Sequence, residues 1–342
     1  MQEIPQRIAE PLIKWFIEHK RELPWRQDKD PYHVWISEIM LQQTRIEAAL
    51  SSYRRFTEEL PDIESLAKID DDTLMKLWEG LGYYSRARNL KKAAQMIMRD
   101  FGGRFPSTYR EIITLPGIGE YTAGAIASIC FDEPVPAVDG NVLRVVARVN
   151  ADDSNVLLPQ TKKRVTAMLR AIMPRQSGAF NEGLMELGET VCLPNGAPKC
   201  GECPIQRSCK AYRDGMTEKL PVRIKQLKRT RVEKTVFLIR TADGRLALEK
   251  RPEKGLLAGL YQLPYIDGYY STEELCGILT EWGLCVSNLY HHKDAKHVFT
   301  HIDWLMKSYS VAVEQPTDRF IWVTGDELQS IYPLPTAYRK LL

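Results

Sequence analysis

The 342-residue sequence has no apolar stretch that approaches the roughly 20 residues of a membrane-spanning helix, and its start carries no basic segment followed by an apolar run. It also lacks internal repeats and low-complexity segments. The net charge is only +3, so attraction to nucleic acid would depend on where basic residues lie and not on their total. We therefore expect a folded cytoplasmic protein without a membrane segment. The hydrophobic content of 44% is enough for two or three domains with real cores.

The glycine-rich segment 115–125 (LPGIGEYTAGA) lacks the features of two common phosphate-binding sites. No Gly-Lys-Ser/Thr ends the turn as in a P-loop, and no strand of branched residues precedes it as in a dinucleotide fold. It lies instead between two predicted helices. Backbone N–H groups around Gly117 and Gly119 could bind a DNA phosphate, as in a helix-hairpin-helix module. An ordinary helix–helix turn with a glycine cap is the alternative.

The region from Ile8 to about residue 210 has apolar residues at three- and four-residue spacing, which predicts an all-α half. Within the predicted helix 34–56, Glu38 lies off the apolar stripe, so the simple interpretation is an exposed glutamate. The segment 81–84 (LGYY) places two aromatic residues, Tyr83 and Tyr84, on a glycine-marked turn, where they either cover a core or wedge into DNA. The predicted helices are 11–19, 34–56, 72–79, 85–99, 109–113, 121–130, 141–149, 162–172 and 178–191.

The composition changes after Cys209. Residues 219–234 hold seven Lys or Arg against one acid, Glu233, which indicates a basic linker that is either solvated or placed along nucleic acid. Strand patterns and two helix patterns follow and predict a small α/β domain. The predicted strands are 235–240, 245–249, 296–301, 304–313 and 319–323, and the predicted helices are 271–281 and 325–330.

Four of the seven cysteines fall within eighteen residues, in the pattern C-x7-C-x2-C-x5-C. Such clustering favours a metal centre in a reducing compartment over disulfides. A structural zinc and an iron–sulfur cluster are both compatible with four thiolates, although zinc ribbons normally pair two C-x-x-C units. The pattern favours the cluster. The four candidate ligands are Cys192, Cys200, Cys203 and Cys209.

The order of hairpin, Asp139 about twenty residues later, and four-cysteine loop resembles the endonuclease III superfamily of DNA base-excision glycosylases. Within that superfamily, the segments 23–26 (LPWR), 35–44 (WISEIMLQQT), 80–90 (GLGYYSRARNL) and 137–142 (AVDGNV) resemble the MutY-type adenine DNA glycosylases. The resemblance covers nearly the whole chain.

The resemblance implies a multidomain fold, an all-α helix-hairpin-helix glycosylase domain with an iron–sulfur loop followed by a small α/β Nudix-like domain. The expected glycosylase region is 1–214, with a six-helix barrel at about 28–135 and flanking helices and the iron–sulfur loop at 136–214. A basic linker, 215–234, and the Nudix-like domain, 235–342, follow.

The resemblance also implies a monomeric enzyme that binds double-stranded DNA and removes adenine mispaired with 8-oxoguanine or guanine, with a [4Fe–4S] cluster on the four cysteines. Hydrolysis of the N-glycosidic bond needs a proton on the base and negative charge beside the sugar, which two carboxylates of different pKa can supply. By resemblance, Glu38 is the general acid that protonates adenine, in a pocket that raises its pKa. Asp139 stays ionised and stabilises the cation, and Asn141 supports it. From the residues alone, Asp139 could equally be a helix N-cap.

Tyr121 occupies the hairpin position where strand-cutting relatives carry a lysine that forms a Schiff base. A phenol cannot do so, and a monofunctional glycosylase is expected. The resemblance assigns Arg26, Gln43 and Glu182 to the flipped adenine, with Glu182 the least secure of the three.

Recognition of the opposite base is assigned by the same resemblance. Leu81 and Tyr83 would enter the duplex beside the oxidised guanine, and the loop Phe299, Thr300 and His301 would probe it. The C-terminal domain lacks the glutamate run that a Nudix hydrolase needs to hold magnesium, which argues against pyrophosphatase activity.

The sequence departs from the family at the first cysteine gap, which has seven residues where six are usual. The gap is rich in proline and glycine and can absorb one residue at small entropic cost. Two other functions are alternatives to this one. An endonuclease III-like glycosylase with AP lyase activity is opposed by Tyr121 and Glu38, and a non-catalytic DNA-binding protein would not need Glu38 and Asp139 together.

Overall fold

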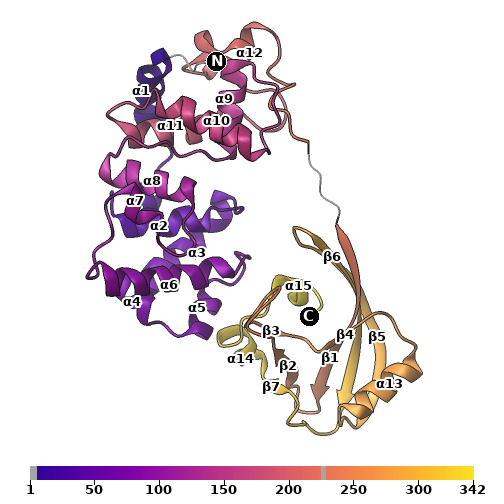
Figure 1. The fold of residues 1–342 in the computed structure, drawn as a ribbon. Coiled ribbons are helices and arrows are strands. Elements are labelled where there is room, and N and C mark those ends of the chain that lie inside the picture. The colour runs from indigo at the N-terminus through magenta and orange to yellow at the C-terminus, as the bar shows by residue number, and fades with distance from the viewer. Residues whose placement is uncertain (1–5, 225–228) are drawn as a thin grey trace. The chain divides into compact units, whose positions relative to one another are not determined.

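The computed structural model describes residues 6–224 and 229–342. The chain forms two compact units (Figure 1). Unit 1 comprises Met1–Lys68 and Asn89–Lys225, and unit 2 comprises Ile69–Arg88 and Gln226–Leu342. Of the predicted basic linker, Lys225 and Lys228 lie outside the described residues. Each unit is considered by itself below.

Unit 1 is helical, as the apolar spacing predicts. Within the described residues, none of the helices combines the length and the apolar character needed to cross a membrane. The helices are α1 (Ala9–His19), α2 (Pro31–Met40), α3 (Ile46–Glu59), α4 (Ile63–Lys68), α6 (Ser85–Asp100, whose first turn belongs to unit 2), α7 (Tyr109–Ile112), α8 (Glu120–Phe131), α9 (Gly140–Asn150), α10 (Pro159–Arg170), α11 (Ser177–Thr190) and α12 (Lys210–Arg213).

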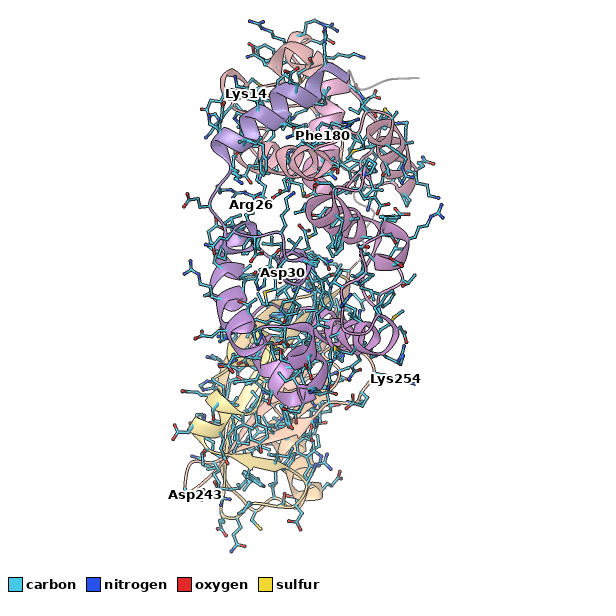
Figure 2. The ribbon with its side chains drawn as sticks, turned by 90° about the vertical axis from the view of Figure 1, so that its left-hand side faces the viewer. Lys14, Arg26, Asp30, Phe180, Asp243 and Lys254 are labelled. Atoms are coloured by element: carbon cyan, nitrogen blue, oxygen red, sulfur yellow. The ribbon has the colours of Figure 1, made fainter. Side chains whose placement is uncertain are left out.

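The core beside the site is formed by α1, α9, α10 and α11. Val142, Val145 and Val149 recur at helical spacing on α9 and pack with Leu184 of α11. Phe180, labelled in Figure 2, is fully buried in the same core. This packing fixes the start of α9 against the middle of α11, where the candidate site lies.

The predicted helix 34–56 is wrong as a single element. The chain leaves α2 after Met40 and starts α3 at Ile46, and Gln43 in the connecting turn has a left-handed backbone with φ +61°. A left-handed residue cannot continue a right-handed helix, so the apolar stripe belongs to two helices with different axes. The turn places Gln43 at the candidate site.

Unit 2 holds α5 (Asp71–Leu77) and a small mixed sheet with flanking helices. The strand order is β3-β2-β1-β6-β5, with β4 also paired to β1 and β7 to β2. The pair β1·β6 is parallel and the others are antiparallel. The elements are β1 (Thr230–Thr241), β2 (Leu246–Lys250), β3 (Tyr261–Gln262), β4 (Tyr265–Asp267), α13 (Thr272–Glu281), β5 (Val286–Val298), β6 (Ile302–Val313), β7 (Ile321–Val323), α14 (Gly325–Ser330) and α15 (Thr336–Arg339).

Both faces of the central strand β1 are buried. Val236 and Leu238 pack in a cluster with Tyr338 of α15, whereas Phe237 packs in a second cluster with Leu279 of α13. Because alternate side chains of a strand point to opposite faces, one apolar run serves both cores. The domain is therefore a sheet between two helical layers.

Several elements of the structure differ from the sequence predictions. Strand β1 begins at Thr230, inside the predicted linker, because its first residues pair with β6 from Ile302 onward. The predicted strand 296–301 is instead the end of β5 and a tight turn, closed by the backbone bond from Phe299 N to Ile302 O. The sequence pattern did not indicate five short elements, because each is too short for a periodic pattern. They are α4, α12, α15, β3 and β4.

Candidate active site

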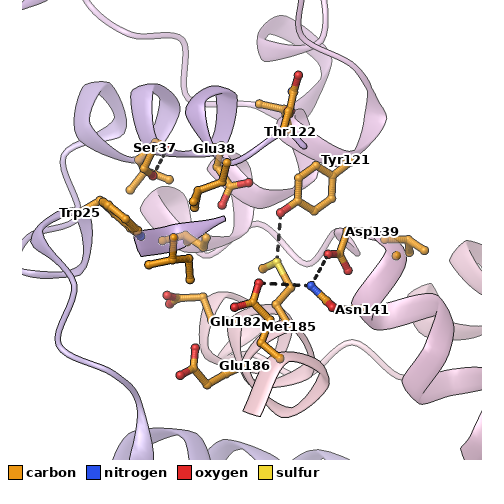
Figure 3. Close-up of a pocket in the computed structure, with 18 of the residues that line it drawn as sticks. Trp25, Ser37, Glu38, Tyr121, Thr122, Asp139, Asn141, Glu182, Met185 and Glu186 are labelled. Carbon is orange, nitrogen blue, oxygen red and sulfur yellow. Dashed lines mark hydrogen bonds between the residues drawn. The ribbon is translucent and has the colours of Figure 1, made fainter. Parts of the chain in front are cut away.

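A cavity of about 670 Å³ lies in unit 1 among α2, α8, α11 and the segments that precede α2 and α9 (Figure 3). The structure brings to it most of the residues predicted to act in catalysis or adenine binding. Gly117, the four cysteines and the predicted recognition residues of unit 2 are not part of its lining. The predicted residues that line the cavity are Arg26, Glu38, Gln43, Gly119, Tyr121, Asp139, Asn141 and Glu182.

Glu38 projects from α2 into the cavity and is buried. The expectation of an exposed glutamate is wrong because α2 is buried on nearly every side, so the face opposite the apolar stripe meets other helices and not solvent. Burial raises the pKa of Glu38 from 4.5 to about 7. The negative charges of Asp139 and Glu182 add to this rise of the pKa, whereas Tyr121 and Arg26 oppose it.

Asp139 is the N-cap of α9. Its Oδ1 accepts a hydrogen bond from the backbone N–H of Val142 at 2.8 Å, and its Oδ2 accepts one from Asn141 Nδ2 at 2.8 Å. Burial raises the pKa of Asp139 above 3.8, and these two hydrogen bonds oppose the rise because they favour the ionised form. The residue therefore caps the helix and also presents a carboxylate to the cavity.

Tyr121 stands near the start of α8, and its hydroxyl lies 3.1 Å from the Met185 sulfur. Burial, together with the nearby carboxylates Glu38 and Asp139, holds the pKa of Tyr121 well above 10. The phenol is accordingly neutral at physiological pH. The side chain of Tyr121 therefore presents a neutral hydroxyl to the cavity.

A run of ion pairs forms the cavity wall on α11. Arg26 Nε donates to Glu182 at 3.0 Å and Arg26 Nη2 donates to Glu186 at 2.9 Å. Arg21 donates to Glu186 at 2.6 Å and to Glu189 at 2.8 Å. We call Arg21, Arg26, Glu182, Glu186 and Glu189 the carboxylate–arginine array.

The sequence analysis missed Arg21, Glu186 and Glu189, as well as Met185 beside Tyr121. One available signal was the spacing of the three glutamates, because residues four and three apart share one face of a helix. Their arginine partners lie about 160 residues away in the sequence, and no local pattern points to them.

The glycines of the hairpin differ in what they permit. Gly117 has φ +79°, and a Cβ there would lie 2.6 Å from Cβ of Asn89. Gly119 is the N-cap of α8 with φ −101°, and a Cβ there would meet nothing within 4 Å. Gly117 is thus required by the fold, whereas Gly119 leaves open space beside the N-terminus of α8, where N–H groups can meet an anion.

The residues predicted to recognise the opposite base lie in unit 2. Tyr83 is 47% exposed, and its hydroxyl lies 3.0 Å from Oγ1 of Thr300 in the turn between β5 and β6. Arg86 supports the Tyr83 turn by donating to the backbone oxygens of Leu81 and Gly82. Leu81 itself is 7% exposed, so it would have to leave its packing to enter a duplex.

The four clustered thiols line one small cavity between α9, α11 and the loop that follows α11. Arg148 donates to Cys192 Sγ at 3.2 Å and to the backbone oxygen of Leu193 at 2.9 Å. Across residues 6–224 and 229–342, no group of three or more His, Cys, Asp or Glu side chains is arranged to hold a single metal ion. The structure thus brings the four candidate ligands to one cavity, and four thiols around a shared cavity fit a metal centre with four thiolate ligands.

Two family matches cover much of the helical part of the chain and all of the C-terminal sheet domain. Residues 36–175 match the family described as HhH-GPD superfamily base excision DNA repair protein, and residues 235–342 match the NUDIX domain. A thermostable thymine-DNA glycosylase structure is 27% identical, with a TM-score of 0.55 over 61% of this chain and 97% of that one. An endonuclease III–DNA complex, 24% identical, shares the fold with a TM-score of 0.51 over 62% of this chain and 96% of its own. Fold and hairpin define a helix-hairpin-helix base-excision glycosylase with a Nudix-like domain.

Proteins with similar sequences identify the family within this class. The adenine DNA glycosylase of Rattus norvegicus is 32% identical over 96% of this chain and 76% of its own length. That of Buchnera aphidicola subsp. Baizongia pistaciae is 32% identical over 97% of this chain and 94% of its own. The human enzyme is 31% identical over 96% and 72%. The chain belongs to the adenine DNA glycosylase family.

Proposed function

We propose that this chain repairs double-stranded DNA by removing adenine from pairs with 8-oxoguanine or guanine, through hydrolysis and without cutting the strand. Family membership assigns the enzyme class, an adenine-specific DNA N-glycosylase of base-excision repair. One observation carries the mechanism. A buried carboxyl group with a pKa of about 7, Glu38, shares a cavity with a second carboxylate, Asp139.

The two carboxyl groups suit different steps of glycosidic hydrolysis. Below its pKa of about 7, Glu38 carries a proton that it can donate to N7 of adenine, which makes the base a better leaving group. Asp139 accepts two hydrogen bonds that favour its ionised form, so it can stabilise the sugar as positive charge develops. Asn141 orients Asp139 for this role.

Adenine must leave the base stack to reach this cavity. Arg26, Gln43 and Glu182 line the cavity beside Glu38 and supply donors and acceptors for the base edge. All of these groups come from one chain, which supports action as a monomer. Because Tyr121 presents a phenol and no amine, a Schiff base with the sugar cannot form there, and the strand stays intact.

DNA binding and recognition of the opposite base are assigned to other elements. The hairpin with Gly117 and Gly119 binds a backbone phosphate at the N-terminus of α8. Tyr83 inserts beside the lesion together with Leu81 once that side chain leaves its packing. Phe299, Thr300 and His301 contact 8-oxoguanine, where a hydroxyl can pair with the O8 or N7–H that guanine lacks.

Cys192, Cys200, Cys203 and Cys209 would hold a [4Fe–4S] cluster, which would fasten the loop after α11 to the cavity that α9 and α11 also line. Arg148 donates a hydrogen bond to the Cys192 sulfur and so helps to hold this side chain at the cavity. The extra residue between the first two cysteines extends an exposed part of the loop and leaves the thiols at one cavity.

The test uses a duplex with adenine opposite 8-oxoguanine, incubated with the intact chain and then treated with alkali. Strand scission only after alkali is expected. Scission without alkali would show lyase activity and contradict the monofunctional mechanism, and no scission in either case would leave only DNA binding. Iron and sulfide analysis of the purified protein tests the cluster, with about four irons per chain expected.

A further inference from the structure

The carboxylate–arginine array spans the cavity wall opposite Glu38. Three glutamates on one face of α11 alternate with two arginines from the segment between α1 and α2. Figure 3 shows Glu182 and Glu186 of α11 with their carboxylates toward the cavity. At its far end, Glu189 accepts a long hydrogen bond of 3.4 Å from Asn141, the partner of Asp139. The array therefore reaches from the surroundings of one proposed catalytic carboxylate to those of the other.

Glu186 is the centre of the array and differs from the other two glutamates. Its side chain is 1% exposed, and it accepts hydrogen bonds from both arginines, including the Arg21 backbone N–H at 3.3 Å. Glu182 contacts Arg26 alone, and Glu189 contacts Arg21 at the exposed end. A buried carboxylate is stable only when such partners compensate for lost water, so the two arginines and Glu186 hold one another in place.

We propose that Glu186 is a positioning residue for excision, which fixes the Arg21 and Arg26 guanidinium groups on the α11 wall and keeps Arg26 directed at the flipped base instead of at Glu38. This inference rests on the proposed function. Arg26 donates through Nε, Nη1 and Nη2 to Glu182, the Arg21 backbone oxygen and Glu186. A guanidinium is a planar fork, so these three contacts leave its plane a single orientation.

The charge of Arg26 matters to the proposed acid. Arg26 lowers the pKa of Glu38, while burial and the carboxylates Asp139 and Glu182 raise it. If Glu186 were neutral, Arg26 would be free to turn toward the remaining carboxylates, and Glu38 would lose its proton at lower pH. The charged and titratable groups that face Glu38 are Arg26 and Glu182 of the α11 wall, Tyr121 and Cys130 of α8, and Asp139 before α9.

The alternative is a plain structural tether between α11 and the chain before α2. A tether predicts that loss of Glu186 lowers stability and leaves the pH dependence of excision unchanged. A positioning role predicts a slower chemical step and a pH profile displaced to lower pH. A matched control is available in Asp152, a buried carboxylate of unit 1 that pairs with Arg164 and does not line the cavity.

The experiment measures single-turnover excision of adenine opposite 8-oxoguanine between pH 5.5 and 9 for the intact chain and for Glu186→Gln, Glu186→Asp and Asp152→Asn. Small misplacements of a substrate-positioning group cost up to about a hundredfold, so Glu186→Gln should slow excision by about tenfold to a hundredfold at pH 7.5. Its rate should also fall off at lower pH than in the intact chain. Glu186→Asp keeps the charge, so its excision rate and pH profile should lie between those of the intact chain and those of Glu186→Gln. Asp152→Asn should unfold at lower temperature with an unchanged pH profile.

Coupling to Arg26 provides the second readout. In an Arg26→Met background, Glu186→Gln should have little further effect on the rate, because the group through which it acts is gone. Wild-type rates and pH profiles in both Glu186 variants, or full additivity with Arg26→Met, would overturn the proposal. If Glu186→Gln does not fold, the test rests on Glu186→Asp. A pH profile of Glu186→Asp that equals that of the intact chain would also overturn the proposal. Absence of excision by the intact chain would instead refute the proposed function.

Discussion

In the cavity of unit 1, Glu38 is buried on α2 and Asp139 is half-buried at the N-cap of α9, where Asn141 donates a hydrogen bond to it. In unit 2, Tyr83 and Thr300 lie on exposed turns and meet through a hydrogen bond between hydroxyls. Burial shifts the pKa of a carboxyl group, and acid catalysis needs such a shift. Residues on exposed turns can instead adjust their conformation when they contact a base pair of bound DNA. We infer that chemistry and lesion recognition are separable, and the predictions below test that separation.

The largest effect is expected at the acid. Glu38→Gln removes the transferable proton and keeps the side-chain shape, so excision should fall by about a hundredfold to ten-thousandfold, the usual contribution of general acid catalysis. Binding of a duplex with adenine opposite 8-oxoguanine, followed by gel shift, should change little because recognition lies elsewhere. Excision at the rate of the intact chain would remove Glu38 from the mechanism.

The same substitution should alter how stability depends on pH. Because the pKa of Glu38 rises from 4.5 unfolded to about 7 folded, its contribution is favourable below pH 4.5 and is lost as pH rises through 7. Glu38→Gln does not titrate, so relative to the intact chain its free energy of unfolding should increase by up to about 3 kcal/mol between pH 5 and 8. Urea titrations at both pH values measure this difference. A constant difference would show that Glu38 is not held in an environment that disfavours its charge.

Local sequence patterns predict some features of the site, whereas features that depend on distant parts of the chain are not predictable from them. The hairpin glycines, the cap position of Asp139 and the cysteine loop depend on local patterns, and each appears in the structure at its predicted residues. The burial of Glu38 depends on which helices surround α2, and the partners of Arg26 lie on α11, far along the chain. The left-handed backbone at Gln43 has no glycine or proline to mark it. The first two features depend on long-range packing, which a single sequence does not display, and the third has no local signal.

Thr300→Ala tests whether lesion recognition by unit 2 can be lost without loss of catalysis in the cavity of unit 1. Loss of a polar contact to the lesion costs roughly 1–3 kcal/mol of discrimination, so the preference for adenine opposite 8-oxoguanine over adenine opposite guanine should fall about tenfold to a hundredfold. The rate opposite guanine should stay the same because the cleft is untouched. Tyr83→Phe is the matched control, since it removes the same hydroxyl–hydroxyl bond and keeps the ring. Equal losses on both substrates would place Thr300 in general DNA binding.

The smallest effect is expected at the hairpin. A change there should weaken the binding of duplexes with adenine opposite 8-oxoguanine and opposite guanine by the same factor. Gly119→Ala fits the backbone, since φ is −101° and no atom lies within 4 Å of the new Cβ. The methyl group occupies space beside the N–H groups of α8, so duplex affinity should weaken by about tenfold, comparable to one lost charged hydrogen bond. The melting temperature should not change.

Gly117→Ala is the contrasting variant at the hairpin. A Cβ at φ +79° would collide with Asn89, so this variant should lose about 1–3 kcal/mol of stability.

Anisotropy titrations at fixed salt, with undamaged, guanine-mispaired and 8-oxoguanine-mispaired duplexes, measure the DNA affinity of both hairpin variants. Because a phosphate contact carries no sequence information, Gly119→Ala should weaken all three duplexes by the same factor. A loss confined to the 8-oxoguanine duplex would link the hairpin to lesion recognition and break the separation between the two units.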